Sequence, residues 1–181
     1  MYVAKKKRKE NIVEFIIYML QVQDTIRAFG LNKPEIERKL LPSYNVSEKE
    51  LEELREWYFG LVDQLISENK QKNGIVQSIL NTINEVNELH LWLLDSSDHA
   101  NYSQIFENIR PSLIEYKIKT KVGSENDIQL AINLIYSFVL LKMKGEEISD
   151  ETSKAVKEIS LFLNKLARYF VDYENGNIQV V

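Results

Sequence analysis

Apolar side chains recur every three or four residues along most of the chain, which is the spacing of one face of an α-helix. The first stripe runs through Ile12, Met19 and Ile26 and closes at Gly30. Glycine at that place is typical of a left-handed helix C-cap, because it carries no Cβ. The pattern therefore predicts a first helix over residues 11–30.

Further stripes, separated by turn residues, predict helices in the rest of the chain. Pro34 stands where a first-turn proline belongs, and Pro42 ends the short helix that it begins. Ser47 with Glu50 three residues later is a capping box. The predicted helices after the first are 35–41, 47–69, 75–94, 102–120 with a kink or a division at Pro111, 127–144, and a last one that Ser149 caps and Asn175-Gly176 ends.

These elements predict an all-α fold, an up-and-down helical bundle of about six or seven helices. Short connections favour antiparallel neighbours, with Gly123-Ser124 as one of the breaks. The segment 127–144 is apolar on most of its circumference, so we expect it to be the central, most buried helix. The whole of 1–181 is predicted to be a single helical domain, with a basic arm at 1–9 and a tail at 175–181 that frays.

Composition limits the chemistry that the chain can perform. Of 181 residues, 44% are hydrophobic and 28% are charged, as in ordinary globular domains. The absence of cysteine excludes disulfides, thiolate nucleophiles and cysteine-ligated zinc, and it favours a reducing cytoplasm. The longest apolar run, 128–143, is interrupted by polar residues and is shorter than the roughly 20 residues of a membrane-spanning helix.

Charge is divided unevenly between the start of the chain and the remainder. The net charge is −4, but without the first ten residues 18 Lys and Arg face 26 Asp and Glu, which gives −8. An acidic body disfavours nucleic acid as a partner, because such affinity needs many cations. A weak contact with nucleic acid or an anionic surface remains an alternative for the basic arm, through Lys5, Lys6, Lys7, Arg8 and Lys9.

The same basic run resembles the start of a secretory leader, since an apolar stretch follows it. Glu14 interrupts that stretch, no small-residue cleavage site follows, and the apolar positions continue at helical spacing. We therefore expect this segment to be the first helix of a mature cytoplasmic protein.

His90 is the sharpest candidate for chemistry, because it lies on the apolar stripe of its predicted helix. A carboxylate-bridged metal site needs Glu-x-x-His, and Asn87 stands where that Glu would be, so we predict no metal. The favoured interpretation is a core histidine that is hydrogen-bonded to a carbonyl or a carboxylate.

The alternative is a ligand pocket near His90 that includes Glu14 and Tyr18, which share a polar line beside the first apolar stripe. Trp57 and Trp92 are further pocket candidates, although aromatic residues at helical spacing are more often core. Asp24 and Arg27 are expected to form only a pair on adjacent turns.

Motifs for catalysis and cofactor binding are missing from the sequence. It contains no Walker A loop, no dinucleotide-binding glycine pattern, no His-Glu-x-x-His and no Gly-x-Ser-x-Gly. We predict no catalytic residue and no cofactor.

Several short segments resemble a known family in the same order along nearly the whole chain. They include Glu56-Trp57-Tyr58 and Leu89-His90-Leu91, and the full set is 2–5, 7–12, 18–28, 56–58, 89–91, 93–94, 158–160 and 162–163. The chain resembles an uncharacterised Bacteroidetes family, the domain of unknown function 4924. The resemblance implies a helical bacterial cytoplasmic protein and brings no activity, cofactor or catalytic residue.

The sequence thus favours a non-catalytic protein-interaction or scaffolding bundle over an enzyme. We expect it to associate with itself as a dimer, or with another protein. A small-ligand-binding or hydrolytic bundle with the pocket near His90 is the second possibility.

Overall fold

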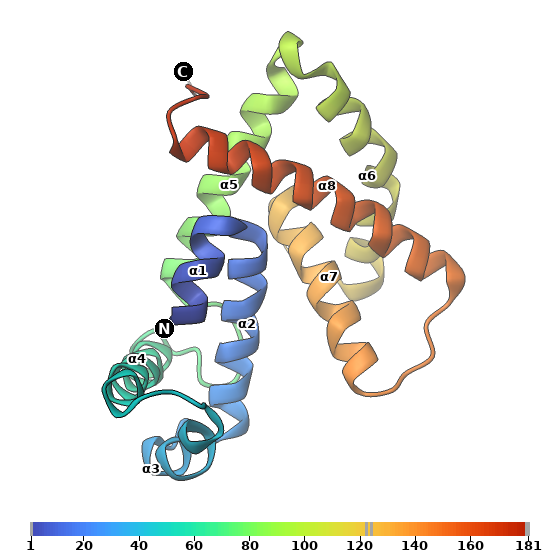
Figure 1. Cartoon of the computed structure of the whole chain (residues 1–181). Coiled ribbons are helices and arrows are strands. Elements are labelled where there is room, and N and C mark those ends of the chain that lie inside the picture. Colours follow the sequence, from blue (N-terminus) through green and yellow to red (C-terminus); the bar gives the residue numbers. More distant parts are fainter. Residues whose placement is uncertain (1, 122, 124, 180–181) are drawn as a thin grey trace. The chain divides into compact units, whose positions relative to one another are not determined.

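The protein is all-α in the computed structural model, which describes residues 2–121, 123 and 125–179 and contains no strand among them (Figure 1). This confirms the predicted fold class. The α-helices are α1 Tyr2–Glu10, α2 Ile12–Ala28, α3 Lys33–Glu35, α4 Glu48–Ser67, α5 Gln77–Asp95, α6 Ala100–Thr120, α7 Asp127–Met143 and α8 Asp150–Glu174.

The chain forms two compact units. The N-terminal unit contains residues 1–8 and 14–81, and the C-terminal unit contains residues 9–13 and 82–181. The boundary passes through α1, α2 and α5, so each of these helices contributes to both units. The single domain expected from the sequence stays a prediction.

The basic segment is a helix of its own, and not an arm that precedes the first helix. α1 buries Ala4, and Asn11 separates α1 from α2. The side chain of Asn11 accepts a hydrogen bond from the backbone N–H of Val13 at 3.0 Å, which satisfies a free donor in the first turn of α2. Lysine and arginine have good helical propensity, so helical structure begins earlier in the chain than the apolar stripe indicated.

The connection between α2 and α4 is a series of tight helical turns. Gly30 has φ +64°, the left-handed conformation expected at the end of the first helix. Asn32 caps α3 by accepting from the N–H of Glu35. A π-helical turn over Ile36–Leu40 and a 3₁₀ turn over Leu41–Ser43 follow, so the predicted short helix 35–41 is present but irregular.

The start of α4 has the capping box that the sequence predicted. The Ser47 hydroxyl accepts from the N–H of Glu50, and the Glu50 carboxylate accepts from the N–H of Ser47 at 2.9 Å. These two bonds satisfy two backbone donors at the helix start.

Two side chains of α2 hold the loop that joins α4 to α5. The Arg27 guanidinium donates to the carbonyl oxygens of Lys70 at 3.1 Å and Gly74 at 2.5 Å, and to Asp24 at 2.7 Å. Gln23 is 1% exposed, and its Oε1 accepts from the N–H of Val76 at 3.0 Å. The predicted pair of Asp24 and Arg27 is present, and Arg27 also bonds to two carbonyls that the loop offers it.

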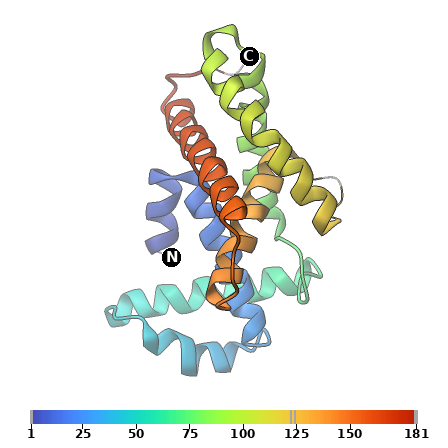
Figure 2. The ribbon, with the colours of Figure 1, turned by 90° about the vertical axis from the view of Figure 1, so that its right-hand side faces the viewer.

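In the C-terminal unit, α6, α7 and α8 pack against one another in pairs (Figures 1 and 2). α6 is one helix through the exposed Pro111, so of the predicted kink or division at this residue the division is absent. Proline has no N–H to donate to the carbonyl oxygen one turn earlier in the helix. Because Pro111 is exposed, water can hydrate that oxygen instead. Of the predicted break at Gly123-Ser124, Ser124 lies outside the described residues.

Burial within α7 is concentrated in its first half. Ile128 and Ile132 are fully buried there, whereas Leu141 is 42% and Met143 is 75% exposed. α8 buries seven side chains along one stripe: Val156, Ile159, Phe162, Leu163, Leu166, Ala167 and Phe170. Ser149 caps α8 as predicted, and Asn175 ends it. Of the predicted tail, residues 180–181 lie outside the described residues.

Within the part of the chain that the structure describes, no helix is both long enough and apolar enough to cross a membrane.

We predict that Gln23→Leu lowers the free energy of unfolding by about 1–3 kcal/mol, because the buried N–H of Val76 loses its acceptor. Urea denaturation measures this loss. Gln71→Ala is the matched control, since this exposed loop glutamine makes only a 3.5 Å hydrogen bond to a carbonyl. Equal stability of the Gln23 variant and the wild type would contradict the role given to Gln23.

Candidate functional site

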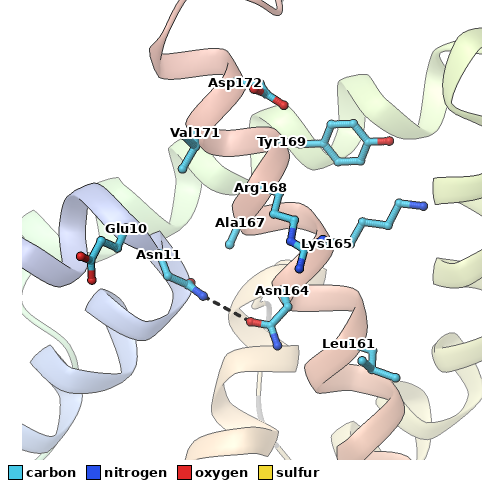
Figure 3. A pocket seen from close by; sticks show the side chains of 10 residues that line it. All are labelled: Glu10, Asn11, Leu161, Asn164, Lys165, Ala167, Arg168, Tyr169, Val171 and Asp172. Carbon is cyan, nitrogen blue, oxygen red and sulfur yellow. Dashed lines mark hydrogen bonds between the residues drawn. The ribbon is translucent and has the colours of Figure 1, made fainter.

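A groove in the C-terminal unit lies along the outer side of α8 (Figure 3). Its volume is about 1020 Å³. One wall is Glu10 and Asn11 of the same unit, where the Asn11 Nδ2 donates to the Asn164 Oδ1 at 3.2 Å. The lining side chains are Glu10, Asn11, Leu161, Asn164, Lys165, Ala167, Arg168, Tyr169, Val171 and Asp172.

The groove combines side chains of both charges with apolar ones. Leu161 is 61% exposed. Lys165 donates to the Asn101 Oδ1 at 3.3 Å, while Arg168 is exposed and makes no ion pair with any described residue. Such a surface can form ion pairs and apolar contacts with a protein segment. Its lining includes no Ser, Thr, Cys or His that could form a nucleophile and base pair.

A smaller groove of about 400 Å³ lies where α6 and α7 meet the start of α8. Lys119 and Glu115 form an ion pair there at 2.5 Å, which raises the pKa of Lys119. Tyr116 and Ser137 share a hydrogen bond of 2.9 Å that joins α6 to α7. Glu115, Tyr116 and Lys119 are therefore engaged, whereas Lys154 and Glu158, which also line this groove, make no ion pair with a described residue.

His90 lies in the core of the C-terminal unit, with 0% exposure. Its Nδ1 is 2.7 Å from the Tyr102 hydroxyl, which links α5 to α6. Ring centroids of Phe106 and Phe162 lie 4.6 Å and 5.7 Å from the His90 ring. The favoured interpretation of a core histidine agrees with this burial, although the partner is a tyrosine hydroxyl and neither a carbonyl nor a carboxylate.

Burial sets the ionisation of this pair. Desolvation lowers the pKa of His90 to about 4, because no carboxylate compensates the charged ring. Desolvation, followed by the nearby Tyr169, raises the pKa of Tyr102. The His90 Nε2 has no hydrogen-bond partner among the described residues. A ligand could reach His90 only if the surrounding rings separated.

The predicted pocket residues are divided between the two units. Trp92 is half-buried in the C-terminal unit, with its ring 5.6 Å from that of His99. In the N-terminal unit, Trp57 packs edge-on to Tyr58 at 5.1 Å.

Glu14 and Tyr18 have different surroundings within the N-terminal unit. Glu14 is exposed and accepts from Lys7 at 2.8 Å. Burial, and secondarily Tyr44, raises the pKa of the Tyr18 hydroxyl. Tyr44 and Tyr58 share a hydroxyl–hydroxyl hydrogen bond of 2.6 Å. The ligand pocket with His90 stays a prediction.

The basic residues of α1 are distributed around that helix. Lys5, Lys6 and Lys9 are exposed, whereas Lys7 and Arg8 are half-buried. Lys7 is engaged with Glu14, so part of the positive charge is used within the N-terminal unit.

Among the described residues, no group of three or more His, Cys, Asp or Glu side chains is arranged to hold a metal ion.

The α8 groove was missed by the sequence reasoning, which used only the apolar stripe of that helix. Its exposed residues Leu161, Arg168 and Asp172 occupy the stripe opposite the buried one. An apolar residue in an otherwise charged stripe was the signal that could have drawn attention to this face.

Comparison with known proteins identifies the family. A family model described as a domain of unknown function, DUF4924, matches residues 1–177, so the chain belongs to this family. No curated protein and no solved structure matches the chain.

The buried His90 predicts a specific dependence of stability on pH. Its pKa is about 4 in the folded protein and about 6.5 in the unfolded chain, so the unfolded chain binds the proton first as pH falls. The contribution of neutral His90 to the free energy of unfolding is complete above about pH 6.5. It is lost as the pH falls towards about 4, and the loss amounts to at most about 3 kcal/mol.

Urea denaturation of wild type and His90→Gln at a series of pH values tests this, since glutamine can still bond to Tyr102. We expect the slope between about pH 6.5 and 4 to be shallower in the variant. Identical slopes would show that His90 does not titrate in this way.

Proposed function

We propose that the protein is a non-catalytic protein-interaction module that associates with itself. The observation that carries this proposal is the open groove along α8, which exposes Leu161 between side chains of both charges. A centre of exposed apolar surface with a polar rim is typical of protein interfaces.

The position of His90 supports a role without catalysis. The residue best suited to acid–base chemistry is enclosed by rings and hydrogen-bonded to Tyr102. A general base must come within hydrogen-bonding distance of the proton that it removes. His90 and Tyr102 instead join α5 to α6 in the core.

Other exposed apolar side chains in the C-terminal unit add to the surface that a protein partner would cover. Ile114 and Ile118 of α6 are 52% and 71% exposed, and Met143 of α7 is 75% exposed. Ile114 and Ile118 lie four residues apart and therefore share one face of α6.

We also infer that the protein is bacterial, of Bacteroidetes origin, and acts in the cytoplasm. The resemblance noted in the sequence supports the origin. The absence of cysteine supports a reducing compartment.

Sedimentation velocity at increasing protein concentration tests self-association. We expect the average mass to rise from one subunit towards two, because the groove is open to a second molecule. Native mass spectrometry of the same sample shows whether a small molecule is retained. A single-subunit mass at all concentrations would contradict self-association, and a stoichiometric small-molecule adduct would contradict a purely protein-binding role.

A further inference from the structure

The outer face of α8 carries six side chains spaced alternately four and three residues apart. This is the spacing of a seam along which one helix packs against another. The stripe lies opposite the buried stripe of α8, and all of its members are exposed except Lys165, which is half-buried. This outer seam consists of Lys154, Glu158, Leu161, Lys165, Arg168 and Asp172.

From this pattern we propose that the outer seam binds the outer seam of a second copy, with the two α8 helices antiparallel. This inference rests on the self-association proposed above and names its surface and register. The two-fold axis passes level with residue 163, midway between the ends of the seam. Both copies then present the same surface, as a closed dimer requires.

Charge selects this arrangement. In the antiparallel register Lys154 lies opposite Asp172 of the second copy, and Glu158 lies opposite Arg168. The two-fold axis repeats both pairs, so four ion pairs form. None of these four side chains makes an ion pair within the described part of its own chain, so their charges are available.

The centre of the seam is apolar. Leu161 of each copy meets the aliphatic stem of Lys165, whose ammonium group is directed to Asn101 at 3.3 Å. A lysine stem can cover apolar surface while its charge stays in contact with polar groups. The Leu161 side chain, which is exposed in a single copy, would thereby be covered in the dimer.

Other alignments of the same seam are disfavoured by repulsion. In a parallel pair each charge would face its own copy, lysine against lysine and aspartate against aspartate. An antiparallel shift by one heptad in either direction places Lys165 against Arg168 or Lys154 against Lys165. Like charges opposite one another select against a wrong partner or register.

A charge exchange tests the register. Glu158→Arg and Arg168→Glu should each raise the dimer dissociation constant at least about tenfold at low salt, because each creates two repulsive contacts. The double variant Glu158→Arg with Arg168→Glu should restore it to within about threefold of wild type. Sedimentation velocity measures all four proteins, and thermal melting verifies that each is folded.

The restoration distinguishes an intermolecular pair from an effect within one helix. Residues 158 and 168 are ten positions apart, about 15 Å along α8, so they cannot pair within one chain. In the double variant, like charges lie one turn apart within the same helix, at positions 154 and 158 and at positions 168 and 172. These neighbours weaken the helix, so a recovered dissociation constant can come only from contacts between the two copies. Lys117→Glu on the exposed end of α6 is the control, and it should not change the dissociation constant.

The possible outcomes separate this inference from the proposed function. Weakening by both single variants with recovery in the double variant supports the antiparallel seam. A dimer that none of the variants affects overturns the seam and leaves self-association in place. A wild type that is a single subunit at every concentration overturns both.

Discussion

The C-terminal unit depends on α8, whose 25 residues separate apolar and charged side chains onto opposite faces. The inner stripe brings Phe162 to the ring of His90 and packs against α6 and α7. Because an amphipathic helix gains most of its stability from this packing, the inner stripe fixes the orientation of the outer one. The interaction surface that we infer is therefore a consequence of how the core is packed.

Polar side chains inside the core act as connections between helices and loops. His90 bonds to Tyr102 between α5 and α6, while Gln23 and Arg27 bond to the backbone between α4 and α5. Each satisfies a group whose burial without a partner would be costly. In His90 this holds for Nδ1, whereas Nε2 has no hydrogen-bond partner among the described residues.

Local signals predicted most of the helices, because capping and apolar spacing act within a few residues. The capping box of Ser47 and the cap at Ser149 are both present. Contacts between distant segments were not predictable in this way. The bond from Gln23 to Val76 spans 53 positions, and that from Asn11 to Asn164 spans 153. The groove along α8 depends on such contacts, so the sequence alone did not reveal it.

Distances between two copies test the antiparallel arrangement most directly. The chain has no cysteine, so a spin label can be attached at one introduced cysteine, at Lys157 or at Asn175. At about 1.5 Å per residue, the account predicts axial separations of roughly 18 Å for position 157 and roughly 36 Å for position 175. Short and equal distances at both positions would show a parallel pair and contradict the account.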